Sequence, residues 1–351
     1  MKNRIPLWDN VKFLMILLMV IGHFALFLYN KSYTCKTIYV FIYAFHMPVL
    51  FFVAGLFYSP ERAKQRILYY FFSGLILKLA LFLCRCLLGK EPTFALLSEG
   101  DLPWFMFALV HFNLLMIPLR HVNKWFVIGV SVLLACFVGY DTSVGDFLVL
   151  SRTIVFFPFF FSGTLFVKET LEQKIIAVKK RYWIVCPLAI ALLLAWGYIC
   201  FHRQSDVLKY LHLFKGKYAF TAKVIRFGPL ARLGCYIVTA LTGAAVILLC
   251  PHREVKGVTK MGSNTIHVYF WHMIIYVLLA EIIPFEQIFL SGTFGRLAYF
   301  AIGALLCITI CSIRLFKWPL DSIKPLIQID PVLPRDPKVS VEEQDKKDEE
   351  K

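Results

Sequence analysis

Long apolar runs separated by short polar segments dominate the chain. Each run is roughly 16 to 22 residues long, close to the ~20 residues that an α-helix needs to cross the hydrocarbon core of a bilayer. Charged residues, proline and glycine mark the breaks between runs. The pattern predicts an all-α, polytopic integral membrane protein with about ten transmembrane helices, near residues 11–29, 37–58, 67–88, 104–119, 125–140, 148–167, 182–201, 229–250, 265–283 and 297–316.

The lysines and arginines between these runs predict the orientation. One alternate set of short segments is rich in them, whereas most segments of the other set are poor. Cytoplasmic segments usually carry this excess, so we expect a cell-membrane protein with both termini in the cytoplasm. Loop 202–228 is basic yet falls on the outer side, but long loops count less in this rule. The basic set contains Lys2, Arg4, Arg62, Lys64, Arg66, Arg120, Lys124, Lys168, Lys174, Lys179, Lys180, Arg181, Arg253, Lys256 and Lys260.

Composition agrees with a membrane protein and excludes several other classes. The chain is 59% hydrophobic and only 17% charged, whereas a soluble domain is ~45–50% apolar and ~25% charged. The net charge of +16 lies in short clusters, so we expect no nucleic-acid partner. The ten cysteines are scattered, mostly in apolar runs, and predict reduced packing residues and no metal site. Residues 1–317 form one predicted transmembrane domain, and residues 318–351 a disordered cytoplasmic tail.

The first apolar run, VKFLMILLMVIGHFALFLY, carries one histidine, His23, near its centre. Ionisable groups at that depth are costly, so such a group is a candidate functional residue. Lys12 precedes His23 by about three helical turns and shares its face, about 16 Å away. Asp9 lies on the same face, where it can pair with Lys12. Three interpretations stay open: a structural histidine bonded to another helix, a catalytic group, or part of a solute pathway.

The second run contains His46 immediately before Met47-Pro48. Because proline has no N–H, it leaves a helix carbonyl without its usual partner. His46 can donate to such a carbonyl, or it can line a site together with His23. The loop that follows carries Arg62 and Arg66, which are either a topology signal or a cationic mouth for a phosphorylated ligand.

Three further polar residues lie inside or beside apolar runs. Lys78 is near the middle of the third run, so it needs a partner. Arg152 opens the sixth run, where it can reach the lipid headgroups or contact an acceptor. His272 has Tyr269 and Tyr276 on the same helix face, which indicates either a polar network lining a cavity or core packing.

Four blocks of the chain resemble the membrane acyltransferase-3 family, in particular its fucose-4-O-acetylase-like branch. They are WDNVKFLMILLMVIGH, FIYAFHMPVLFFVAG, SRTIVFFPFFFSG and MGSNTIHVYFWH. The resemblance implies about ten helices, acetyl-coenzyme A as donor, and O-acetylation of a carbohydrate or cell-envelope acceptor. The family's basic-x10-His pattern corresponds to Lys12 and His23, and its preceding aspartate to Asp9. Lys12 stands where many members have arginine.

The resemblance also implies roles. His23 is the expected catalytic residue, either as a general base or as the group that accepts the acetyl. Lys12, Arg62 and Arg66 are the expected donor-binding residues, although the spacing of the two arginines departs from the family's R-x-x-R pattern. The expected supporting or acceptor-side residues are Asp9, His46, Lys78, Arg152 and His272. A solute transporter or flippase fits the helix pattern equally well, and a membrane scaffold is a third class.

Overall fold

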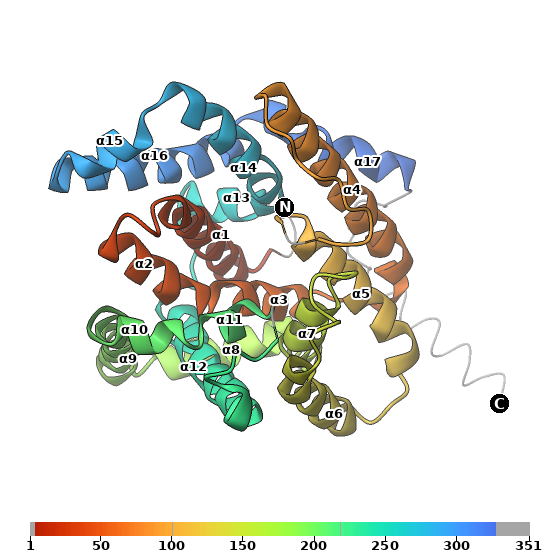
Figure 1. Cartoon of the computed structure of the whole chain (residues 1–351). Coiled ribbons are helices and arrows are strands. Elements are labelled where there is room, and N and C mark those ends of the chain that lie inside the picture. The colour runs from red at the N-terminus through yellow and green to blue at the C-terminus, as the bar shows by residue number, and fades with distance from the viewer. Residues whose placement is uncertain (1–3, 100, 218, 328–351) are drawn as a thin grey trace, which may run out of the picture.

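The computed structural model describes residues 4–99, 101–217 and 219–327, and in these it is helical, without a strand (Figure 1). The α-helices are α1 (Pro6–Phe27), α2 (Tyr33–Tyr43), α3 (His46–Leu56), α4 (Ala63–Leu87), α5 (Trp104–Leu119), α6 (Lys124–Phe137), α7 (Leu150–Thr164), α8 (Lys168–Lys179), α9 (Tyr182–His202), α10 (Gln204–Leu208), α11 (Leu211–Lys215), α12 (Gly228–Leu249), α13 (Val258–Gly262), α14 (Thr265–Ile282), α15 (Phe285–Leu290), α16 (Thr293–Ser312) and α17 (Leu320–Leu326).

The described residues contain seven apolar helical segments long enough to cross a membrane. One of them is α2 and α3 together, and the pair α7 and α8, bent by 84°, would be an eighth. Helices α5 and α6 are apolar but shorter. A multi-pass, all-α membrane protein is therefore confirmed, whereas the count of about ten crossings stays a prediction.

Polar contacts join the loops at each of the two ends of the helix bundle. Where α1 begins, Asn10 Nδ2 donates to the carbonyl oxygens of Pro251 and Arg253, and Trp8 Nε1 donates to Lys168 O. Where α1 ends, Lys31 pairs with Glu286, and Gln204 Nε2 donates to Tyr33 O. We call these ends the N-terminal face and the opposite face.

The second predicted span is broken between α2 and α3. Pro48 has no N–H to donate to Ala44 O, which instead accepts a hydrogen bond from Thr239 Oγ1 at 2.6 Å. Trp196 Nε1 donates to Phe41 O. His46 Nδ1 lies 2.8 Å from Ile42 O, so His46 donates to a carbonyl at the break. The bonds to Ala44 O and Phe41 O satisfy carbonyls that the break would leave unpaired in an apolar interior, and Ile42 O also accepts from Phe45 N.

Helices α3 and α7 pack with their backbones in direct contact at two glycines. A Cβ atom on Gly55 would lie 1.9 Å from Phe160 O, and one on Gly163 would lie 2.1 Å from Phe52 O. Small residues allow this close approach of apolar helices, which brings van der Waals packing that larger residues would prevent.

Gly163→Ala is therefore expected to destabilise the protein by about 1–3 kcal/mol, the usual cost of overpacking. The measurement is the thermal unfolding of purified protein. Gly129→Ala is the matched control, because a Cβ atom there meets nothing within 4 Å. Equal unfolding temperatures for the two variants would contradict the proposed contact between α3 and α7.

The structure continues beyond residue 318, where the sequence predicted a disordered tail, with a short helix. Helix α17 lies within the segment expected to be disordered from residue 318 onward. Its Asp321 accepts from Lys324 and lies 3.6 Å from His267 Nε2 of α14. Leu320 and Ile323 are buried, which gives this short helix an apolar anchor. The rest of the predicted tail, residues 328–351, lies outside the described residues.

Candidate functional site

Helix α1 lies near the middle of the molecule, with α2, α3, α13, α14 and α16 against it (Figure 1). This position turns His23 toward α14, where His272 is fully buried. His23 Nδ1 lies 2.9 Å from His272 Nε2, and the two rings are close to parallel at 17°. The histidine of the first apolar run thus has a partner 249 residues away in the sequence.

The hydrogen bonds of His272 decide which nitrogen of His23 carries the proton. His272 Nδ1 lies 2.8 Å from Val268 O and 3.0 Å from Tyr269 O. Carbonyl oxygens only accept, so His272 Nδ1 carries the proton, and Nε2 of the neutral ring accepts. His23 Nδ1 must then donate to it. In the neutral pair, His23 Nε2 therefore keeps an unprotonated lone pair, the state that a general base or a nucleophile requires.

Tyr43 separates His23 from the second buried histidine. Its ring lies 6.2 Å from the His23 ring and 4.8 Å from the His46 ring, between ring centres. His46 is thus one side-chain layer from His23, and a site lined by both stays a prediction. His46 Nδ1 also donates to Ile42 O, so His46 has a structural role at the helix break as well.

A cavity of about 190 Å³ runs inward from the N-terminal face, between α1, α3, α4, α5 and α14. Lys12 lines it at one end, and Tyr269 lines it on α14, about one turn before His272. Lys12 Nζ forms the predicted ion pair with Asp9 at 2.7 Å. The cavity is largely apolar with a cation at its rim, which suits a long uncharged chain that ends in an anionic group.

Cations gather around Phe57 at the rim of this cavity. Lys12 Nζ and Lys168 Nζ lie 5.6 and 5.3 Å from the centre of its ring, and Arg66 donates to its carbonyl oxygen at 2.7 Å. Sequence reasoning missed Lys168, which it treated only as a topology signal. The Arg62 side chain makes no hydrogen bond or ion pair among the described residues, so the structure does not bring it into this group.

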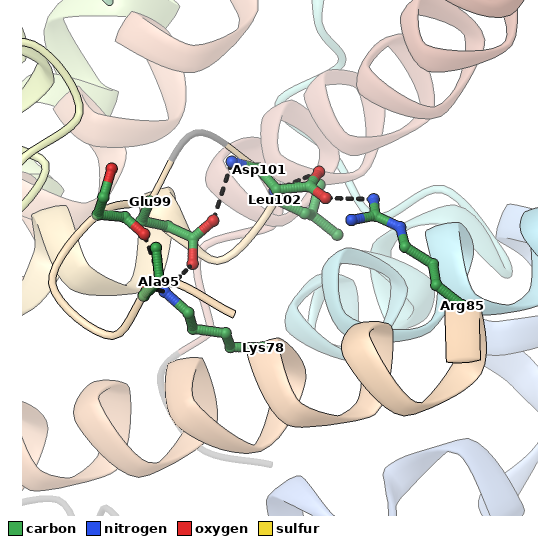
Figure 2. A network of polar contacts seen from close by, with 7 residues as sticks. Lys78, Arg85, Ala95, Glu99, Asp101 and Leu102 are labelled. Atoms are coloured by element: carbon green, nitrogen blue, oxygen red, sulfur yellow. Dashed lines mark hydrogen bonds and ion pairs between the residues drawn. The ribbon is translucent and has the colours of Figure 1, made fainter. Parts of the chain in front are cut away.

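Lys78 belongs to a polar network on the opposite face, shown in Figure 2. It pairs with Glu99 at 3.0 Å and donates to the carbonyl oxygens of Ala95 and Ser98. Arg85, two helical turns further along α4, pairs with Asp101. The network surrounds a pocket of about 320 Å³ and fixes the loop before α5 against α4. Lys78 thus has the partner that its depth requires.

Arg152 is buried at the start of α7. Its guanidinium lies 4.6 Å from the centre of the Trp104 ring and 4.0 Å from Asp146 Oδ1. Arg152 therefore points inward to protein groups, and the interpretation that it reaches to headgroups does not apply.

The family model of an acyltransferase domain matches residues 5–313. The chain belongs to the membrane acyltransferase-3 family. No curated protein and no solved structure matches it. The match covers every helix from α1 to α16, so the His23–His272 pair, the Lys12 cavity and the Lys78 network all lie within the acyltransferase domain. Among the described residues, no cluster of acidic, histidine or cysteine side chains suits a metal ion.

Proposed function

We propose that this membrane acyltransferase transfers an acetyl group from acetyl-coenzyme A to a hydroxyl of a carbohydrate, either a cell-envelope glycan or its precursor. The main support is the unprotonated Nε2 of His23, held by the bond to His272. Membership of an acyltransferase family favours this enzyme over the transporter or flippase. The excess of basic residues at the N-terminal face supports a cytosolic location for that face.

In this proposal the donor enters from the cytosol. The donor's phosphates contact Lys12 and Lys168, while its thin, uncharged arm extends along the apolar cavity toward Tyr269. Phosphate suits these lysines because both are point charges beside an aromatic ring that excludes water from one side. The thioester then reaches the level of His23.

The transfer itself needs one base. The acceptor hydroxyl oxygen attacks the thioester carbon as its proton passes to His23 Nε2. The carbon–sulfur bond then breaks, and the proton protonates the leaving thiolate, so that the products are the acetyl ester and coenzyme A. His272 accepts the Nδ1–H bond throughout and thus keeps the ring in position while it is charged. Acceptance of the acetyl group by Nε2 itself uses the same lone pair.

Donor binding offers a direct test. With labelled acetyl-coenzyme A and a mixture of envelope glycans, Lys12→Glu is expected to raise the KM for the donor at least ~10-fold, because a charged phosphate contact is lost. The KM for the acceptor should change little. Lys64→Glu is the matched control, since Lys64 is exposed on the same face. Equal donor KM values for both variants would contradict the proposed donor route, and labelled ester absent from every glycan would contradict the proposed reaction.

A further inference from the structure

A second group of cations lies away from the donor cavity. Arg152, Lys215 and Lys217, which we call the cationic cluster, come from α7 and from the loop that contains α11. Lys217 Nζ lies 3.0 Å from Asp146 Oδ2, and Arg152 Nη2 lies 4.0 Å from Asp146 Oδ1. Lys215 Nζ lies 5.7 Å from the centre of the Tyr39 ring. Two of the three cations thus pair with Asp146, whereas Lys215 contacts an aromatic ring.

Lys215 has no carboxylate of its own. No ion pair joins it to any described residue. Its side chain is half-buried, and α11 packs against α2 and α12. Burial first, and then the charges of Arg152 and Lys217, lower the pKa of Lys215, while Asp146 opposes them. Withdrawing a cation even partly from water without an ion-pair partner is costly, so an anion supplied by a ligand would bind favourably beside Lys215.

Neighbouring acidic side chains do not supply this anion. Glu99 and Asp101 are in the adjacent loop, but Glu99 pairs with Lys78 and Asp101 pairs with Arg85, as Figure 2 shows. The backbone holds that loop to the Asp146 segment, because Glu99 N donates to Asp146 O at 3.1 Å. Both acidic groups of the adjacent loop are therefore already engaged by their own cations.

The cluster lies next to the candidate catalytic residue. The rings of Tyr39 and Tyr43 are 3.8 Å apart, and Tyr43 contacts His23 edge to face. Lys215, Tyr39, Tyr43 and His23 thus form a continuous series of contacts. If the anionic group of a ligand bound to Lys215, only the rings of Tyr39 and Tyr43 would separate that group from His23.

The donor cannot supply this anion in the proposed arrangement. Lys12 lies about 16 Å from His23 along α1, toward the N-terminal face. The cationic cluster is held by the loops of the opposite face, since Ser151 Oγ donates to Gly216 O at 2.7 Å. Gly216 has a φ of +62° and approaches Val155 closely, which fixes the loop between Lys215 and Lys217 on α7. The donor's phosphates and this cluster thus lie on opposite sides of His23.

The geometry points to an anionic subsite for the acceptor, formed by Lys215 with Arg152 and Lys217, so that the sugar which receives the acetyl group carries a carboxylate or a phosphate. This inference rests on the proposed function, because it names the class of acceptor for the same site. A charge-assisted bond to Lys215 would hold the anion, while a hydroxyl of the same sugar meets His23 Nε2. Neutral sugars lack the group that compensates Lys215.

The test compares two matched pairs of acceptors. One pair is octyl glucuronide and its uncharged methyl ester, and the other is an octyl phosphodiester of glucose and octyl glucoside. The enzyme is expected to prefer the anionic member of at least one pair by about 10- to 100-fold in kcat/KM. A preference in the first pair would identify a carboxylate as the anionic group of the acceptor, and a preference in the second pair would identify a phosphate. Lys215→Met should reduce the preference below about threefold by raising the acceptor KM, and Lys215→Arg should retain most of it.

Lys223→Met is the matched control, because Lys223 is exposed on the same loop. Binding of all four acceptors is measured by calorimetry beside the rates, so that the subsite is tested even without turnover. Selective binding of an anionic acceptor without acetyl transfer would overturn the proposed reaction and leave the subsite intact. Equal binding of charged and uncharged acceptors, or a preference unchanged in Lys215→Met, would overturn the subsite.

Discussion

Replacing His23 by alanine is expected to lower acyl transfer by at least ~100-fold, the usual minimum for the loss of a general base. The physical reason is the single lone pair on Nε2, which either takes the hydroxyl proton or attacks the thioester. The two neighbouring histidines do not stand in its place, because His272 Nε2 is occupied by the bond to His23, and the ring of Tyr43 lies between His46 and His23. The measurement is the initial rate of labelled acetyl transfer per mole of purified protein.

His23→Asn separates chemistry from folding in this experiment. An asparagine amide places its N–H near the position of Nδ1, so it can still donate to His272, but it has no atom at the position of Nε2. The asparagine variant should therefore unfold at the wild-type temperature and be as inactive as the alanine variant. If either variant kept more than about a tenth of the wild-type rate, His23 would not be the catalytic residue.

Local sequence spacing predicted those parts of the site that lie on one helix. The ion pair of Asp9 with Lys12 follows from a separation of three residues on α1. Pro48 indicates a helix break near His46, and at that break His46 donates to Ile42 O four residues earlier, whereas the carbonyl that Pro48 itself frees, Ala44 O, accepts from Thr239. In both cases the interacting groups are neighbours in the chain, so helical geometry alone brings them together.

Contacts between distant segments were beyond such reasoning. His272 was a candidate residue, but its bond to His23 depends on which face of α14 packs against α1. Lys168 reaches Phe57 because the chain bends sharply between α7 and α8. Lys215 reaches Tyr39 because a short helix in a long loop packs between α2 and α12. Hydrophobic periodicity identifies helices but does not specify which of them are neighbours.

The number of membrane crossings was also uncertain for a physical reason. Helices α5 and α6 are apolar but too short to span hydrocarbon alone. Near the start of α5, Tyr269 donates to Leu102 O, and Trp104 packs under Arg152. The loop before α5 thus reaches into the helix bundle. The loop and α5 together therefore extend further through the protein than the apolar helix does alone. Such a loop is tolerated in a membrane protein because protein groups satisfy its backbone.

Replacing His272 by leucine is expected to lower kcat at least ~10-fold with little change in either KM, because His272 positions His23 and does not contact the substrates. Without the acceptor at Nε2 of His272, the Nδ1–H of His23 has no partner in an apolar interior. The tautomer with its proton on Nε2 then becomes accessible, and that tautomer has no lone pair for the acceptor hydroxyl. Rates at saturating donor and acceptor give the measurement.

His272→Gln distinguishes this positioning role from a role in packing alone. The glutamine amide oxygen lies near the position of His272 Nε2 and can accept from His23 Nδ1, while its amide nitrogen cannot replace the bond from Nδ1 to Val268 O. The glutamine variant should therefore recover most of the lost kcat even though it packs less well than histidine. If leucine and glutamine variants of equal thermal stability showed the same kcat, the bond to His23 would not set the reactive tautomer, and His272 would be a packing residue of α14.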